Sequence, residues 1–215
     1  AIHQDMAFFL GEEQLFYYPP WEVRSTDMFS FQADDSLRRM EILGHLSRKK
    51  IAVFVLPLQA LMQRVLPVQA WFDYMETIAL GDICDRDQLV EKLIAGGYKR
   101  VSLVEGKGEF GVRGSVLDIF PTAAENPLRL EFLGDELESI RIFSPASQRS
   151  AGELCDFTLF PAGEIIFTAA VKQLAVVNIR RRANELELSS LIKNRLVEAV
   201  AADGDAGWAR AEGRR

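Results

Sequence analysis

A run of alternating apolar and polar residues between Tyr98 and Phe143 constrains the fold of this chain more than any other feature of its sequence. Successive side chains of a β-strand point to opposite faces of a sheet, so alternation with a period of two predicts strands. Gly134-Asp135 interrupts the pattern with a pair that is typical of a two-residue hairpin turn. The stretch therefore predicts an antiparallel sheet with one buried face.

The phase of the alternation assigns side chains to the two faces of this sheet. From Leu128 to Phe132 the even-numbered residues are apolar, which predicts that they enter the core and that Arg129, Glu131 and Leu133 lie on the opposite face. If the same phase holds through the preceding strands, four further apolar residues share one face: Phe110, Val112, Val116 and Phe120.

The flanking segments predict helices and a buried strand. Residues 51–56 are apolar without alternation, the pattern of a parallel strand that is covered on both faces. Residues 37–46 have the pattern of an amphipathic helix, and residues 34–36 offer N-caps for it. A capping-box pattern at Asp85 opens another helix, and the chain becomes helical again after Pro161.

The order of these segments predicts an α/β fold, in which a small domain with an antiparallel β-sheet is inserted into an α/β domain. We expect residues 1–75 to form the first part of the α/β domain and residues 76–161 to form the inserted β domain. Residues 162–215 are expected to form a helical second part of the α/β domain.

Composition excludes several other classes of protein. The 215 residues are 48% hydrophobic and 26% charged, as in ordinary globular proteins. A net charge of −6 gives no global positive field that would draw nucleic acid to the chain. The sequence has no apolar run of the length that spans a membrane, and its two cysteines fit no zinc-binding spacing. We therefore expect a cytoplasmic protein.

No arrangement of residues in the sequence predicts catalysis. Of the two histidines, His3 is near the first residue and His45 lies on a predicted helix beside Gly44, which leaves nothing to work as a Ser/His/Asp triad or as a histidine metal cluster. The glycine-rich segment 105–111 contains Lys107, but a phosphate-binding loop needs Ser or Thr directly after its lysine and then a helix. Gly108 and a strand pattern follow instead, which favours a β-hairpin or bulge loop over a nucleotide site. We expect no enzymatic activity, cofactor or metal in this chain.

Two groups of arginines are candidates for binding a partner. Arg113 and Arg129 lie in predicted strands, and Arg129 shares its face with Leu133, a combination typical of protein interfaces. The alternative for Arg129 is a solvent-facing salt bridge to a cross-strand acid, which would contribute little to stability. Residues 180–182 are consecutive arginines on a predicted helix, where a solvated face is favoured over phosphate binding because acidic residues follow.

Several motifs resemble a known family. These are Gly97-Tyr98 and the segments 108–121 (GEFGVRGSVLDIFP), 129–141 (RLEFLGDELESIR) and 147–150 (SQRS). Further matches lie upstream, at Pro20-Trp21-Glu22, Asp27, Phe29, 36–38 and 57–64, and the segment beyond Gly163 matches most weakly. Together they resemble the N-terminal UvrB-like module of bacterial transcription-repair coupling factors (Mfd). The second-ranked interpretation is a fragment of a UvrB-type excinuclease and helicase, which contacts DNA and nucleotide. Such proteins carry a tyrosine-rich hairpin, and no segment of that kind follows Trp21 in this sequence.

The resemblance implies a degenerate, helicase-like α/β domain, interrupted by a β domain that docks UvrA, the damage-recognition protein of nucleotide excision repair. The residues carried over to that role are Arg113, Arg129 and Leu133, the last at a position where members of the family often have phenylalanine. Binding of RNA polymerase and DNA, and the use of ATP and magnesium, belong to other modules of such proteins.

The predicted outward position of Arg129 has a consequence for stability. As a surface substitution, Arg129→Ala is expected to change the free energy of unfolding by no more than about 0.5 kcal/mol. Phe132→Ala, which removes a predicted core side chain, is expected to cost roughly 3 to 5 kcal/mol.

Overall fold

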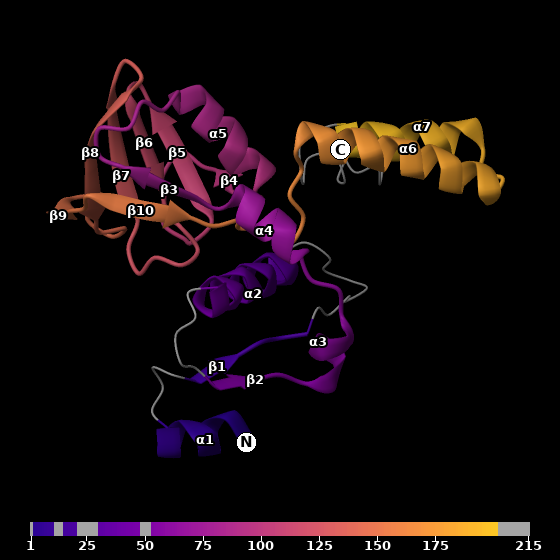
Figure 1. Cartoon of the computed structure of the whole chain (residues 1–215), viewed down its shortest axis with the longest axis horizontal. Helices are drawn as coiled ribbons and strands as arrows, with labels where there is room; N and C mark the ends of the chain where they lie inside the picture. Colours follow the sequence, from indigo (N-terminus) through magenta and orange to yellow (C-terminus); the bar gives the residue numbers. More distant parts are fainter. Residues whose placement is uncertain (1, 11–14, 21–29, 48–52, 202–215) are drawn as a thin grey trace.

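The computed structural model describes residues 2–10, 15–20, 30–47 and 53–201. It is a mixed α/β structure with three regions: a β-rich region, a lobe built from the N-terminal segments, and a pair of helices near the C-terminus (Figure 1). The upstream motif residues Trp21, Glu22, Asp27 and Phe29 lie outside the described residues.

A six-stranded sheet forms the centre of the β-rich region. Its strands follow one another in chain order and all neighbours are antiparallel except the first two, which are parallel. This confirms the predicted antiparallel sheet, including the hairpin at Gly134-Asp135. The strands are β4 (Lys99–Arg100), β5 (Glu109–Arg113), β6 (Val116–Ile119), β7 (Leu128–Leu133), β8 (Glu136–Phe143) and β9 (Ser150–Glu153).

The phases predicted for β5 and β7 are confirmed, whereas the phase predicted for β6 is wrong. In β5, Phe110 is buried and Val112 packs against the same core. Leu128, Leu130 and Phe132 are all buried in the core. The tight turn after β5 pairs Arg113 directly with Val116, and residues paired in this way point to the same face. Alternation therefore reverses its phase across the turn, and the inward side chains of β6 are Leu117 and Ile119 rather than Val116. Phe120, which follows β6, is buried in a separate cluster with Val104 and Phe143.

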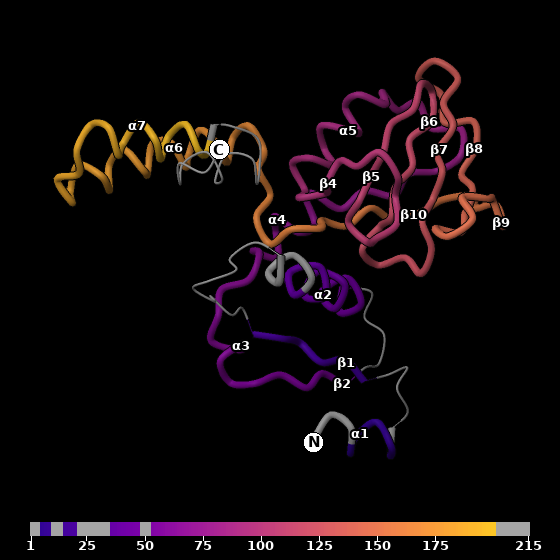
Figure 2. The backbone as a smooth tube through the Cα atoms, turned by 180° about the vertical axis from the view of Figure 1, so that it is seen from behind, coloured from indigo at the N-terminus to yellow at the C-terminus, as the bar shows by residue number. Residues whose placement is uncertain are grey.

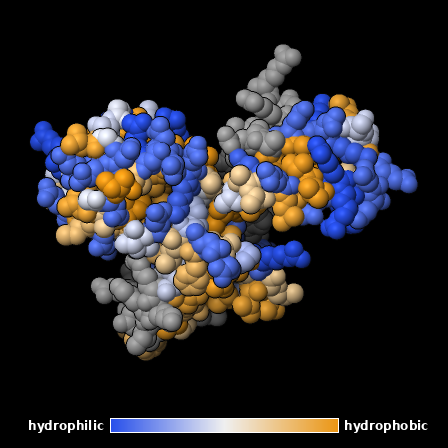
Figure 3. Space-filling view, turned by 45° about the horizontal axis from the view of Figure 1, so that its top comes forward, coloured by the Kyte–Doolittle hydropathy of each residue, from blue (hydrophilic) through white to orange (hydrophobic). Residues whose placement is uncertain are grey.

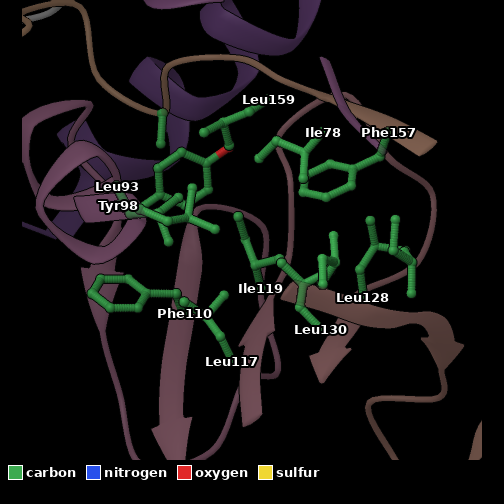
Figure 4. Close-up of a cluster of buried hydrophobic side chains, with 14 of the residues drawn as sticks. Ile78, Leu93, Tyr98, Phe110, Leu117, Ile119, Leu128, Leu130, Phe157 and Leu159 are labelled. Carbon is green, nitrogen blue, oxygen red and sulfur yellow. The ribbon is translucent and has the colours of Figure 1, made fainter. Parts of the chain in front are cut away.

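A helix and a two-stranded ribbon cover the inner face of the sheet (Figure 4). The helix α5 (Arg86–Ala95) contributes Leu89 and Leu93, and the carboxylate of Asp85 accepts hydrogen bonds from two backbone amides at its start, as predicted. The ribbon pairs β3 (Glu76–Ala79) antiparallel with β10 (Asp156–Leu159), and it contributes Ile78 and Phe157.

The N-terminal lobe holds a second, two-stranded sheet. Its parallel strands β1 (Leu15–Tyr17) and β2 (Val53–Val55) pair in register, which confirms a parallel strand within residues 51–56. The side chains of β2 are only half-buried, so the predicted cover on both faces is wrong. The helices of the lobe are α1 (Ile2–Leu10), α2 (Ser30–Ser47), α3 (Leu58–Met62) and α4 (Val68–Tyr74).

The start of α2 differs from the prediction. The helix begins at Ser30, so residues 34–36 lie inside it and do not cap it. No glycine or proline separates Ser30 from Leu37, and nothing in the sequence therefore stops the helix from extending upstream.

The predicted C-terminal helices are α6 (Ala169–Glu185) and α7 (Ser190–Ala201), which lie side by side and project away from the rest of the molecule (Figures 1 and 2). Apolar side chains are visible on this pair and on the N-terminal lobe (Figure 3). Within the described parts of the chain, no helix has the length and apolar character that a membrane crossing requires.

Gly97 and Gly163 allow a close contact between the end of α5 and the segment that follows β10. The backbone amide of Gly163 donates to the carbonyl of Gly96 at 2.8 Å. Gly97 has a φ of +86°, and a Cβ atom there would lie 2.8 Å from the Gly163 nitrogen. A side chain at residue 97 would therefore both strain the backbone and push the two segments apart.

A buried ion pair links the same segment to the N-terminal lobe. Arg39 of α2 is fully buried, and its Nε lies 2.7 Å from Oε1 of Glu164. The guanidinium also donates to the Pro19 carbonyl at 3.0 Å and to Gln63 Oε1 at 3.1 Å, and it stacks over the Tyr18 ring. Burial raises the pKa of Glu164 above its ordinary value in spite of the neighbouring guanidinium.

We expect Glu164→Gln to destabilise the protein by about 3 kcal/mol, because it leaves the buried Arg39 cation without its counter-ion. Glu185→Gln is the matched control, since Glu185 pairs with Arg182 on the exposed side of α6 and should cost less than about 0.5 kcal/mol. Urea unfolding of both variants measures the difference. Equal losses would show that the Arg39–Glu164 pair does not hold the junction.

Candidate functional site

Arg113 and Arg129 converge on one carboxylate, that of Asp118. Asp118 lies opposite Arg129 in the ladder between β6 and β7, and Arg113 reaches the same carboxylate from the end of β5. Asp118 is only 2% exposed. A buried carboxylate needs compensating charge and hydrogen bonds, and the two guanidinium groups supply both.

Arg129 is held on several sides. Its Nε donates to Asp118 Oδ1 at 2.7 Å and its Nη2 donates to Oδ2 at 2.9 Å, a bidentate pair. The guanidinium carbon lies 4.8 Å from the centroid of the Phe143 ring, and Nη1 donates to the Gln148 carbonyl at 3.4 Å. The hydrogen bonds to Asp118 raise the pKa of Arg129 above its ordinary value.

This arrangement corrects the expected surface role of Arg129. The residue does lie on the face opposite Leu128 and Leu130, as its phase predicts, but only 19% of its side chain is exposed. The cross-strand salt bridge that sequence analysis left as an alternative is present, and its acid is buried rather than solvent-facing. The expectation that Arg129→Ala barely changes stability rested on an exposed side chain, and the structure replaces that premise: the substitution would leave a buried carboxylate short of a partner.

Arg113 is the accessible member of the cluster. Its side chain is 53% exposed while one of its Nη atoms pairs with Asp118. Two cations share one anion, so the three side chains carry a net charge of +1. The exposed guanidinium has donors to spare beyond its contact with Asp118, and a second carboxylate could pair with them.

Leu133 lies at the end of β7 on the same face. It is 67% exposed, two residues beyond Glu131, and it precedes the turn in which Gly134 has a φ of +63°. Glu131 accepts a hydrogen bond from Ser139 at 2.9 Å and lies 3.4 Å from a guanidinium nitrogen of Arg141. The structure thus brings Arg113, Arg129 and Leu133 onto one face of the sheet, which we call the outer face of β5–β8.

Asp118 is a member of the site that the sequence alone did not predict. The available signal was a lone acid between Leu117 and Ile119, two residues that sit in the core. A carboxylate flanked by core residues in a strand is rarely buried without a paired cation. Alternation alone did not reveal which arginines supply that cation.

The other candidate segments have structural roles. Strand β5 follows the glycine-rich segment 105–111, as the β-loop interpretation predicts, and Lys107 pairs with Glu41 of α2 at 2.5 Å. Glu109 accepts hydrogen bonds from two backbone amides of the same loop, at 3.0 and 2.9 Å. The arginines at 180–182 are exposed on α6, which agrees with a solvated face.

Comparison with known proteins identifies relatives over most of the chain. Residues 77–164 match the protein family described as the UvrB interaction domain. A transcription-repair-coupling factor of Myxococcus xanthus is 34% identical over 207 residues, which cover 93% of this chain. The proteins of the same name from Bacillus subtilis and from Staphylococcus aureus strain NCTC 8325 are 30% and 34% identical, over 83% and 79% of this chain.

The matches cover only a small share of those relatives. The aligned regions amount to 17% of the Myxococcus xanthus protein, 15% of the Bacillus subtilis protein and 14% of the Staphylococcus aureus protein. The chain therefore spans less than a fifth of the length of each of these relatives.

The cluster geometry predicts different costs for its two arginines. Arg129→Ala should lower the free energy of unfolding by about 2 to 4 kcal/mol, because it removes the bidentate partner of buried Asp118. Arg113→Ala should cost less than about 1 kcal/mol, because Arg113 is largely exposed and Arg129 still neutralises Asp118. Urea unfolding of the two variants side by side checks this order, and a loss as large for Arg113→Ala as for Arg129→Ala would contradict it.

Proposed function

Because the chain corresponds to the region of transcription-repair coupling factors that includes the UvrB interaction domain, we propose that it is a non-catalytic recruitment module that docks UvrA. In this proposal the outer face of β5–β8 is the docking surface, with Arg113, Arg129 and Leu133 as its contact residues. The module would thereby link a stalled RNA polymerase to nucleotide excision repair.

The arginine cluster is the observation that carries the proposal. Arg129 and Asp118 hold each other in place, so the site is rigid before a partner arrives and loses little entropy on binding. Arg113 stays accessible and the cluster keeps a net positive charge, which suits a carboxylate on the partner. Leu133 adds an exposed apolar group close by, and arginines beside apolar groups are typical anchors of protein interfaces.

The proposal assigns the rest of the chain a supporting role. We divide the chain into the segments 1–75, 76–161 and 162–215, in which the first and last belong to a degenerate helicase-like α/β domain and the middle one docks UvrA. The buried Arg39–Glu164 pair supports this division, because it ties the first segment to the start of the last. Contacts with RNA polymerase and DNA, and the use of ATP and magnesium in the cytoplasm, are assigned to other parts of the parent protein.

Arg113→Ala tests the docking surface without disturbing the Arg129–Asp118 pair. We expect the affinity for purified UvrA to fall roughly thirtyfold, because a carboxylate of the partner would be left desolvated and unpaired. Arg181→Ala is the matched control, an exposed arginine on α6 that should leave the affinity unchanged. Calorimetric titration measures both. Undiminished binding by Arg113→Ala would contradict the assignment of this face.

Titration with ATP and magnesium separates recruitment from the alternative, a UvrB-type fragment that binds nucleotide. We expect no saturable binding of ATP and no turnover, because Lys107 is engaged by Glu41 and the loop around it leads into a strand instead of a helix. Saturable micromolar binding of ATP, or its hydrolysis, would favour the alternative.

A further inference from the structure

Ile83 is an exposed isoleucine that the backbone holds next to the docking surface. It is 78% exposed, and it lies between β3 and α5 in a segment that pairs with the start of β8. The amide of Cys84 donates to the Asp135 carbonyl at 2.7 Å, and the amide of Leu137 donates to the Asp82 carbonyl at 3.0 Å. These hydrogen bonds flank Ile83 and fix its backbone, so its exposure is not that of a loose loop.

Strand register places Ile83 on the same face as Leu133. Ile83 is bridged to Glu136, and Glu136 is paired with Leu133 across the hairpin. Residues that lie opposite each other in a ladder point to the same face, so the three side chains form one row. The neighbouring pair, Phe132 and Leu137, points the other way into the core.

The row continues the outer face of β5–β8. On β7, Arg129, Glu131 and Leu133 alternate with the core residues, so Leu133 and its row are on the same side of the sheet as the arginine cluster. From Arg113 on β5 to Ile83 beyond β8 the face spans four strand spacings, on the order of 20 Å. That width fits within one side of a protein interface of ordinary size.

We infer that Ile83 and Leu133 together form the apolar centre of the docking surface, an inference that rests on the proposed function. Leu133 by itself offers one exposed apolar side chain, whereas Leu133 and Ile83 together offer two, one on each side of Glu136 in the row. Arg113 places a positive charge to one side of this row, and Glu136 places a negative charge within it, between the two apolar residues, so the docked protein must match both.

This asymmetry defines the chemistry of the partner surface. The docked protein presents an apolar side chain to Ile83 and Leu133, a carboxylate to Arg113 and a cation to Glu136. Because Arg113 lies to one side of the row and Glu136 lies within it, one orientation of docking pairs opposite charges, whereas the reverse orientation places like charges together.

The test uses the full 215-residue chain and purified UvrA. Ile83→Ser is expected to weaken UvrA binding about tenfold, as for the loss of an apolar anchor at the centre of an interface. Its melting temperature should stay that of the wild type, because the side chain is exposed. Leu174→Ser is the matched control: Leu174 is 62% exposed on α6, away from this face, and its replacement should leave the affinity unchanged.

A second variant tests the charge of the row. Glu136→Lys should slow association with UvrA roughly threefold at low salt, because it turns attraction to the partner cation into repulsion. The difference should disappear as the salt concentration rises.

The outcomes distinguish a failure of the inference about Ile83 from a failure of the proposed docking function. Wild-type affinity in both Ile83→Ser and Glu136→Lys, while Arg113→Ala binds weakly, would overturn the inference and leave the docking function intact. Equal losses in Ile83→Ser and Leu174→Ser would also overturn it. Failure of the wild-type chain to bind UvrA would overturn the proposed function, and the inference would fall with it.

Discussion

The charge of Asp118, buried between two strands, is the constraint on which the outer face of the sheet depends. A buried carboxylate must be paired with a cation. The pairing of the strands places Arg129 of β7 and Arg113 at the end of β5 beside it. Two arginines for one acid leave a surplus positive charge at the surface. The residue that stabilises the fold and the residue that is free to contact a partner therefore belong to the same cluster on the outer face, with Arg129 largely buried and Arg113 exposed.

Local patterns predicted those parts of the fold in which neighbours in sequence are neighbours in space. The hairpin at Gly134-Asp135, the strand β7 and the cap at Asp85 are of this kind. The β3–β10 ribbon was not predicted, because each strand has only four residues and the partners come from opposite ends of the inserted region. The phase error in β6 has a related cause, since a tight turn pairs residues across it and resets the alternation.

The candidate site, too, was predicted only as far as neighbouring residues in the sequence determine it. Alternation placed Arg129 and Leu133 on the outer face, and Arg113 was a candidate both as an arginine of a predicted strand and through the family resemblance. The sequence of one strand does not determine which strand lies beside it. The burial of Asp118 and its bidentate pair with Arg129 therefore became known only from the register between β6 and β7. Ile83 is a further example, because its place beside Glu136 depends on a bridge between segments far apart in the sequence.

Methyl resonances of the labelled chain during addition of UvrA test most directly whether the outer face of β5–β8 is the docking surface. Leu133 and Ile83 carry exposed methyl groups on that face, and Leu174 and Val177 carry exposed methyl groups on α6. We predict that the signals of Leu133 and Ile83 shift or broaden while those of Leu174 and Val177 change no more than the buried core. Perturbation confined to α6, or equal perturbation of both sets, would contradict the account.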